Sequence, residues 1–194
     1  LDQSAGLREV AEARRETMDT RLSRAIDIID SAEPDRHWLL WHDLEDERRA
    51  IEKRLPNVVT VYGSQDLDER EELIVGFGAG KYRILATKPI ICGSGCNFQR
   101  HCSDAIFLGS TYKFNDFIQA VHRIYRFQQQ KPVNIYVIYG ENESPVVETL
   151  KKKWDQHRKL VQRMAGLVRK NQLKSDMELL ALSRQMGVER HAVK

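Results

Sequence analysis

Long hydrophobic runs are missing from this sequence of 194 residues. No stretch approaches the roughly 18 consecutive apolar residues that a membrane span needs. The opening residues, LDQSAGLREVAEARRE, hold no apolar core of a signal peptide and no initiator Met. We therefore expect a chain with no membrane anchor, cut from a longer protein.

Cysteine is scarce as well. The chain has three cysteines, and an odd number argues against a disulfide framework and suits a reducing compartment. Cys92, Cys96, Cys102 and His101 do not match a common zinc pattern, because no cysteine pair has the CxxC spacing. We predict no metal site and interpret these residues as small side chains that fill a tight loop.

A large excess of one charge is also absent, except in one segment. The net charge is +3, and residues 1–147 carry 19 Lys and Arg against 23 Asp and Glu. Residues 148–174 carry nine against two. The basic excess is therefore confined to this late segment, whose apolar spacing is helical.

Five short apolar runs are the clearest signal of regular structure. They are HWLLW at 37, VVTVY at 58, RILAT at 83, AIFLG at 105 and NIYVIY at 134. Runs without alternation are typical of strands buried on both faces, as in parallel sheets. Helix-like segments of about a dozen residues lie between the runs, so the sequence predicts an α/β fold with right-handed crossovers.

Capping residues indicate where the helices begin. Asp43 is expected to cap the first, and Asp66 with Glu69 is expected to form a capping box for the second. The third helix is predicted from about Asn115 to Tyr125.

Helical extensions are expected on both sides of this α/β region. Residues 4–30 have apolar positions at helical spacing, and Ser144-Pro145 opens a long basic helix. A further capping box, Ser175 with Glu178, predicts a separate helix that ends near Gly187. The expected organisation is a helical segment at 1–34, an α/β lobe at 35–143 and a basic helical extension at 144–194.

Two acidic or glycine-rich stretches look like nucleotide motifs but do not match them. GFGAGKY at 76–82 is not a P-loop, because Val75 and Tyr82 stand where the pattern needs Gly and Ser or Thr. WLLWHDLEDE has no P-loop before it, so its acidic residues are interpreted as the first turn of a helix. The chain therefore contains no P-loop.

The stretch ATKPIICGSGCNFQ, residues 86–99, is more informative. Thr87 and Lys88 lie where a predicted strand ends, and Gly93 and Gly95 allow a backbone to approach a ligand closely. Ligands bind α/β sheets at the carboxyl ends of parallel strands, so a binding loop is expected here, with a bland loop as the alternative.

The stretch FIQAVHRIYRFQQQ, from residue 117, carries two arginines three residues apart. On a helix, one face would carry Gln119, His122, Arg123 and Arg126, and the core face would carry Ile118, Val121 and Tyr125. Guanidinium groups match phosphate oxygens in geometry and charge. An arginine pair on a solvated face is the alternative.

Taken together, these stretches resemble the second RecA-like lobe of superfamily-two helicases and translocases. QAVHRIYRFQQ resembles motif VI, Q-x-x-x-R-x-x-R, in its Swi/Snf-type form, and ATKPIICGSGCNFQ resembles motif V. HWLLWHDLEDER occupies the place of motif IV, and VYGSQDLDEREELIVGFGAGKYRILAT has the spacing of the segment between motifs IV and V. The resemblance covers about residues 35–143 and is greatest to helicases encoded by phages and mobile elements.

The resemblance implies a role for each motif residue. In this family ATP and Mg²⁺ lie between two lobes, and the first lobe supplies the P-loop and the Mg²⁺ ligands. The second lobe would supply arginine fingers, and the implied residues are Arg123 and Arg126 as fingers, Gln119, Gly95 and Asn97 at the nucleotide, and Thr87, Lys88 and Gly63 on a nucleic-acid strand. The basic helix, with Lys151, Lys152 and Lys153, would extend that track. The implied partners are DNA and the first lobe of the same protein, in the cytoplasm of a bacterium or from a phage, with RNA left open.

Some positions depart from the family pattern. His122 replaces the usual Gly or Asp, Gln128 replaces a Gly, and motif V carries two extra residues, which blurs the roles of residues 90–94. Without a P-loop the chain is expected to be inactive alone. The alternatives are a non-catalytic nucleic-acid-binding module or a protein-interaction module derived from such a motor.

Overall fold

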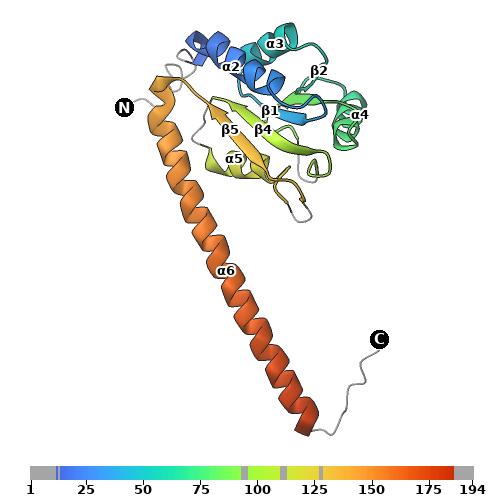
Figure 1. The fold of residues 1–194 in the computed structure, drawn as a ribbon, viewed down its shortest axis with the longest axis vertical. Coiled ribbons are helices and arrows are strands. Elements are labelled where there is room, and N and C mark those ends of the chain that lie inside the picture. The colour runs from blue at the N-terminus through green and yellow to red at the C-terminus, as the bar shows by residue number, and fades with distance from the viewer. Residues whose placement is uncertain (1–11, 13, 93–95, 110–112, 127–128, 186–194) are drawn as a thin grey trace. The chain divides into compact units, whose positions relative to one another are not determined.

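The computed structural model describes residues 12, 14–92, 96–109, 113–126 and 129–185 (Figure 1). The chain divides into two compact units, Leu1–Leu150 and Lys151–Lys194. The first unit holds a β-sheet with its covering helices, and the second holds most of the last helix.

One sheet of five parallel strands forms the centre of the first unit. Its strands lie in the order β2-β3-β1-β4-β5. Their bounds are β1 (His37–Trp41), β2 (Val58–Val61), β3 (Ile84–Thr87), β4 (Cys102–Leu108) and β5 (Asn134–Ile138). Four of the predicted apolar runs contain a strand and the fifth overlaps β4, which begins three residues before its run, so the α/β prediction is confirmed. Because all five strands are parallel, their carboxyl ends meet at one edge.

Helices cover both faces of the sheet (Figure 1). The chain passes from β1 to β2 in one direction and from β2 to β3 in the other, so right-handed crossovers put the two connecting helices on opposite faces. One face packs on α2 (Met18–Asp30) and α3 (Glu45–Arg54), with a core that includes Leu22, Ile29, Trp38, Ile51 and Ile106. The other face packs on α4 (Leu67–Gly78) and α5 (Phe114–Val121), where aromatic pairs form between Phe77 and Phe98 and between Phe107 and Phe117.

The connection from β3 to β4 has no helix in its described residues, 88–92 and 96–101. Phe98 of this loop is buried, with its ring 5.1 Å from that of Phe77 in an edge-on arrangement. Its backbone N–H donates to the carbonyl of Arg123 over 2.9 Å. The loop therefore takes the place of a covering helix between α4 and α5.

The start of α3 differs from the prediction. Its N-cap is Leu44 rather than Asp43, and Glu47 accepts hydrogen bonds from the backbone N–H groups of both residues over 3.0 Å. The Asp43 carboxylate accepts instead from Arg14, over 3.0 Å. The Asp43 side chain, which was expected to cap α3, is therefore bound by an arginine that is distant in sequence. Asp66 does cap α4, because it accepts from the backbone N–H groups of Asp68 and Glu69, which is the Asp66 half of the predicted capping box.

The third predicted helix is shorter than expected. α5 ends at Val121, and residues 122–126 form turns. The core side chain of this turn is Ile124, whereas Tyr125 is 56% exposed, so the prediction for Tyr125 is wrong. Arg123 and Arg126 therefore lie in a turn, and they do not share a helix face with Gln119.

The last helix is longer than expected. After a 3₁₀ turn (Glu141–Glu143), α6 (Ser144–Gln185) begins at Ser144-Pro145, as predicted. It continues through Ser175 without interruption, so the separate helix predicted from Ser175 is wrong. A capping box stabilises a helix start but does not by itself break a helix that good helix formers continue. Gly187 lies outside the described residues.

The N-terminal helical segment is interrupted. Residues 14–16 are helical, Thr17 forms a turn and α2 then begins at Met18. Residues 4–11 of the predicted helix lie outside the described part of the chain. In the ranges that the structure describes, no helix has the length and apolar character needed to cross a membrane.

A buried ionic network joins the N-terminal segment to the rest of the unit. The guanidinium of Arg14 donates to the Glu47 carboxylate over 3.1 Å and to the carbonyl of Leu108 over 2.8 Å, and it lies 3.8 Å from Glu143. Arg21 donates to the same oxygen of Glu47 over 3.0 Å. Segments before α2, in α3, at the end of β4 and before α6 therefore meet at one point.

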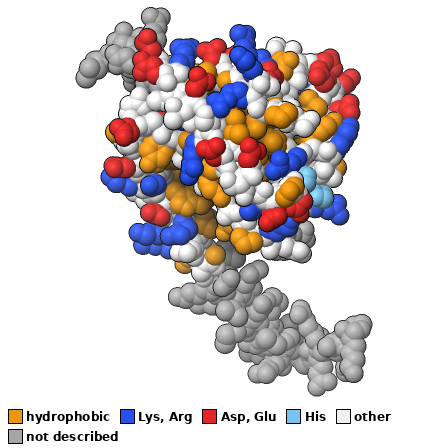
Figure 2. All heavy atoms as spheres, turned by 45° about the horizontal axis from the view of Figure 1, so that its top comes forward, with side chains coloured by type: hydrophobic (Ala, Val, Ile, Leu, Met, Phe, Trp, Pro, Cys, Tyr) orange, Lys and Arg blue, Asp and Glu red, His pale blue; other side chains and the backbone are white. Residues whose placement is uncertain are grey.

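The outer surface on the α2 and α3 side is mixed in charge. Figure 2, in which the top of Figure 1 comes forward, shows Lys and Arg interspersed with Asp and Glu and with apolar groups. Interspersed charges of both signs do not build a large field of one sign over this face.

Candidate functional site

The candidate site forms where the β3–β4 loop meets the turn after α5. A backbone hydrogen bond joins Phe98 to Arg123 over 2.9 Å, and the guanidinium of Arg126 donates to the side-chain oxygen of Asn97. The structure therefore brings three of the predicted site residues, Asn97, Arg123 and Arg126, into one cluster.

The two arginines of this cluster have different surroundings. Arg126 is exposed, whereas Arg123 is 9% exposed. Arg126 can therefore contact a ligand outside the unit directly. Arg123 presents its positive charge from inside, where it is one cause of the lowered pKa of Cys96.

The two thiols of the loop and the thiol of Cys102 in β4 differ in pKa. A hydrogen bond from the Cys92 thiol lowers the pKa of Cys96 to about 6; the charge of Arg123 acts in the same direction, and burial opposes both. The pKa of Cys92 is raised, first by this hydrogen bond and then by burial. Burial raises the pKa of Cys102 to about 12. Sequence reasoning missed this contrast, and its only available signal was a Cys-x-x-x-Cys spacing next to a strand end.

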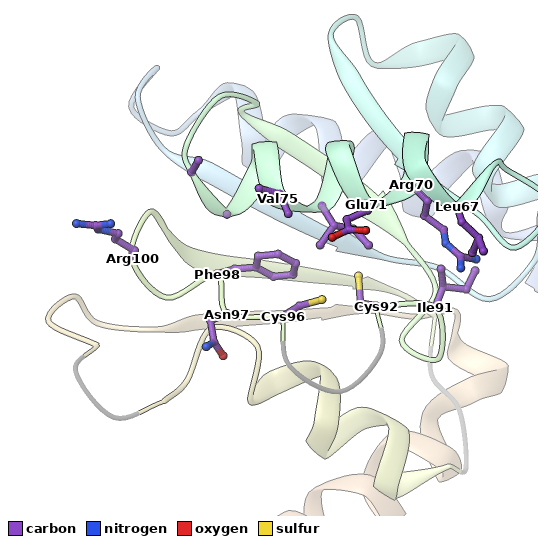
Figure 3. A pocket seen from close by; sticks show the side chains of 13 residues that line it. Leu67, Arg70, Glu71, Val75, Ile91, Cys92, Cys96, Asn97, Phe98 and Arg100 are labelled. Atoms are coloured by element: carbon purple, nitrogen blue, oxygen red, sulfur yellow. The ribbon is translucent and has the colours of Figure 1, made fainter.

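A pocket of about 780 Å³ lies between α4 and this loop (Figure 3). Its lining includes Leu67, Arg70, Glu71 and Val75 from α4, and Cys92, Cys96, Asn97, Phe98 and Arg100 from the loop. Figure 3 shows both sulfur atoms on the side of the loop that faces the pocket, whereas the Asn97 side chain points to the other side. The loop thus presents thiols to the pocket and an amide to the arginine turn.

A second group of predicted residues lies at the carboxyl edge of the sheet. Gly63 follows β2 and is exposed, and Lys88 follows β3 and is half-buried. Thr87 is fully buried, and its hydroxyl donates to the carbonyl of Val61 over 2.8 Å. Thr87 therefore links two strands. The prediction that its side chain contacts a nucleic acid does not fit this burial.

His42, directly after β1, is a buried ionisable group that sequence reasoning did not single out. Its ring is 2% exposed, and burial is the main cause that lowers its pKa. The charges of Glu47 and Lys88 act on it in opposite directions. The positive charge of Lys88 thus lies close to the start of α3, at the carboxyl edge.

The remaining predicted site residues lie on α5, on α6 or outside the described residues. Gln119 is exposed on α5. Lys151, Lys152 and Lys153 are exposed on α6 and belong to the second unit. Gly95 lies outside the described residues.

The cluster suits an anionic ligand better than a metal ion. Its charged groups, Arg123 and Arg126, match phosphate oxygens. Among the residues that the structure describes, no three His, Cys, Asp or Glu side chains gather as a metal site would require. The two arginines of the described cluster therefore suit a ligand with anionic oxygen atoms.

Comparisons with known proteins identify the fold. No protein-family model matches the sequence, and no curated protein matches it. Among solved structures, the chain is similar to the C-terminal part of the Fun30 ATPase domain, with 18% identity and a TM-score of 0.57 over 66% of this chain and 44% of that one. It is also similar to the C-terminal domain of the DEAD-box protein Dbp5, with 15% identity and a TM-score of 0.54 over 74% of this chain and 90% of that one.

These two likenesses, together with the all-parallel sheet and its flanking helices, show a RecA-like α/β fold. The chain spans less than half of the Fun30 chain that it matches.

Proposed function

We propose that this chain is the second RecA-like lobe of an ATP-dependent DNA helicase or translocase, and that Arg123 and Arg126 are its arginine fingers. The observation that carries the proposal is the direct contact between the two motif-bearing segments. Arg126 bonds to Asn97, and Phe98 bonds to the carbonyl of Arg123. Two segments that the sequence assigns to nucleotide chemistry are thereby held as one unit, on a fold shared with the C-terminal part of the Fun30 ATPase domain.

The proposed division of labour follows from what this lobe holds. ATP with Mg²⁺ supplies the transferring phosphoryl group, and a P-loop lobe would bind it on the other side of a cleft. Arg126, which is exposed, would contact the phosphoryl oxygens, and Asn97 would orient its guanidinium. Arg123 would add positive charge from beneath the loop. Arginine fingers are worth ~10³ to 10⁵ in rate in related chemistry.

The nucleic-acid track is proposed at the carboxyl edge of the sheet. Lys88 and the backbone at Gly63 would contact phosphates, which gives grip without reading sequence. Thr87 would act indirectly, since its bond to Val61 joins β2 and β3 beneath these contacts. Opening and closing of the cleft would then move the strand. Competition between DNA and RNA of the same length would test the choice of DNA.

We place the motor in the Swi/Snf-type branch because of the sequence QAVHRIYRFQQ, and propose a bacterial or phage-encoded cytoplasmic protein. The DNA dependence of ATP turnover in the two-lobe protein tests the motor assignment.

The finger assignment is tested in the protein that joins this lobe to its P-loop lobe. Arg126→Ala and Arg123→Ala should each lower kcat for ATP by ~10³-fold or more while DNA affinity stays close to that of the wild type. Lysine should rescue poorly, because a point charge does not reproduce the guanidinium fork. Arg24→Ala is the matched control, because Arg24 is exposed on α2, which covers the opposite face of the sheet.

Near-normal turnover by a variant that unfolds at the wild-type temperature would remove that residue from the finger assignment. The 194-residue chain alone should not hydrolyse ATP, because it would lack the phosphate cradle and the Mg²⁺ ligands.

A second candidate function, protein docking, is favoured by one feature of α6. Leu160, Val161, Met164 and Leu167 are each at least half exposed and recur at helical spacing. If DNA left the ATP turnover of the two-lobe protein unchanged, this non-catalytic reading would be preferred.

A further inference from the structure

The β3–β4 loop contains a thiol pair that the proposed motor mechanism does not use. Cys92 and Cys96 both line the pocket beside α4, each thiol shifts the pKa of the other, and the positive charge of Arg123 acts on both sulfurs. We propose that Cys96 and Cys92 form a redox-active pair, in which a hydroperoxide oxidises Cys96 and Cys92 then closes a disulfide with it.

Access to the two sulfurs is provided by the pocket beside α4. Cys96 is half-buried, and both sulfurs face this pocket of about 780 Å³ (Figure 3). Hydrogen peroxide is small enough to enter it. Cys102, in contrast, is fully buried in β4, where its thiol donates to the backbone carbonyls of His37 and Asp104. Cys102 is therefore an internal control that should not react with peroxide.

The charges around Cys96 favour its thiolate, which is the reactive form. Arg123 comes from the turn after α5, Arg70 and Glu71 come from α4, and Arg100 comes from the same loop. With a pKa of about 6, Cys96 is mainly thiolate near pH 7, whereas Cys102, with a pKa of about 12, stays protonated. Because the thiolate is the reactive form, Cys96 should be oxidised faster than Cys102.

The reaction takes place in two balanced steps. The Cys96 thiolate attacks one peroxide oxygen, the O–O bond breaks, and the departing hydroxide takes a proton to become water, which leaves a sulfenic acid. The Cys92 sulfur then attacks the Cys96 sulfur, the S–O bond breaks, and the second hydroxide leaves as water with the Cys92 proton. Two thiols are oxidised and one peroxide is reduced to two waters. A dithiol reductant reverses the product by thiol–disulfide exchange.

The disulfide would change the contacts of both arginines. It removes the thiolate that lies near Arg123, and it constrains the residue directly before Asn97, the partner of Arg126. The oxidation state of the pair is therefore linked to the geometry of the arginine turn. Disulfide formation is measured on the chain alone, so its outcome does not depend on whether the proposed motor function is correct.

Tryptic peptides separate the pair from the control. Trypsin releases Cys92 and Cys96 together in residues 84–100 and Cys102 in residues 101–113. After treatment with hydrogen peroxide and alkylation in denaturant, the first peptide should be two hydrogen atoms lighter and carry no alkyl group. The second should carry one alkyl group, and a dithiol should restore two alkylation sites in the first.

Single substitutions assign the roles of the two sulfurs. In Cys92→Ser, Cys96 should stop at the sulfenic acid, which dimedone traps. Cys96→Ser should form no disulfide, and Cys102→Ser should behave as the wild type. In the folded chain, Cys96 should react with iodoacetamide clearly faster than the buried Cys102. Similar rates for Cys96 and Cys102, disulfide-linked dimers through Cys96 instead of the internal bond, or an unchanged 84–100 peptide would each overturn the proposal.

Discussion

Removing the charge of Glu47 tests whether the buried ionic network holds the first unit together. Glu47 is 1% exposed and accepts from Arg14 over 3.1 Å and from Arg21 over 3.0 Å. Its other oxygen accepts from two backbone N–H groups at the start of α3. Glu47→Gln keeps the shape but replaces one acceptor oxygen with a donor group, which then faces other donors.

The magnitude follows from the contacts that would be lost. Breaking a buried ion pair by removing one partner costs ~3 to 5 kcal/mol, because a charge is left buried without compensation. Arg14 keeps Asp43 and Glu143 as acidic neighbours. We therefore expect the lower end, a loss of about 3 kcal/mol in the free energy of unfolding, or a fall of about 6 to 12 °C in Tm for a chain of this size.

Urea unfolding followed by tryptophan fluorescence measures this loss, since Trp38 and Trp41 are fully buried in the first unit. The matched control is Glu52→Gln, which removes a partner of Arg48 on the exposed side of α3 and should cost below about 1 kcal/mol. Equal losses in the two variants would refute the reasoning, and so would a Glu47→Gln loss below about 1 kcal/mol with an unchanged urea slope.

Two further predictions concern pH and salt. Because burial lowers the pKa of His42, the unfolded chain binds its proton more readily, so this contribution to stability is complete above about pH 6.5 and is lost as pH falls below it. His42→Gln should therefore flatten the decline on acidification by up to about 1.4 kcal/mol per pH unit, and parallel urea-unfolding curves against pH for both proteins would contradict this. In the two-lobe protein, replacing Lys151, Lys152 and Lys153 with Gln should weaken DNA binding regardless of sequence and reduce the salt slope by roughly two units. Identical slopes in binding titrations would show that the three lysines do not contact phosphates.

The strands could be predicted from sequence because each depends on a signal that is local to it. The run HWLLW became β1, which is buried as expected of a central parallel strand, and the run at 134 became β5, which is only half-buried at the edge of the sheet. Helix ends were less predictable. Asp43 has the side chain of a cap, but Arg14, 29 residues away, bonds to it. α5 ends at Val121, where the N–H groups of Arg123 and Ile124 bond to carbonyls three residues back, and the carbonyl of Arg123 bonds to Phe98 of the loop.

The candidate site was predicted in part, for a similar reason. Motif spacing identified Asn97, Arg123 and Arg126, and the structure brings them together. The burial of Thr87 and the contrast among the three thiols depend on neighbours that are distant in sequence, so residue types alone could not indicate them.

The contacts at Arg14 have a consequence for how the sheet unit could be inserted into another protein. Arg14 lies 3.8 Å from Glu143, and a side chain added at Gly140 would come within 3.0 Å of Thr17. The chain therefore enters and leaves the sheet unit at neighbouring points. A unit of this kind can be inserted into a loop of a host domain without forcing that loop apart, and it can be circularly permuted by joining its ends with a short linker.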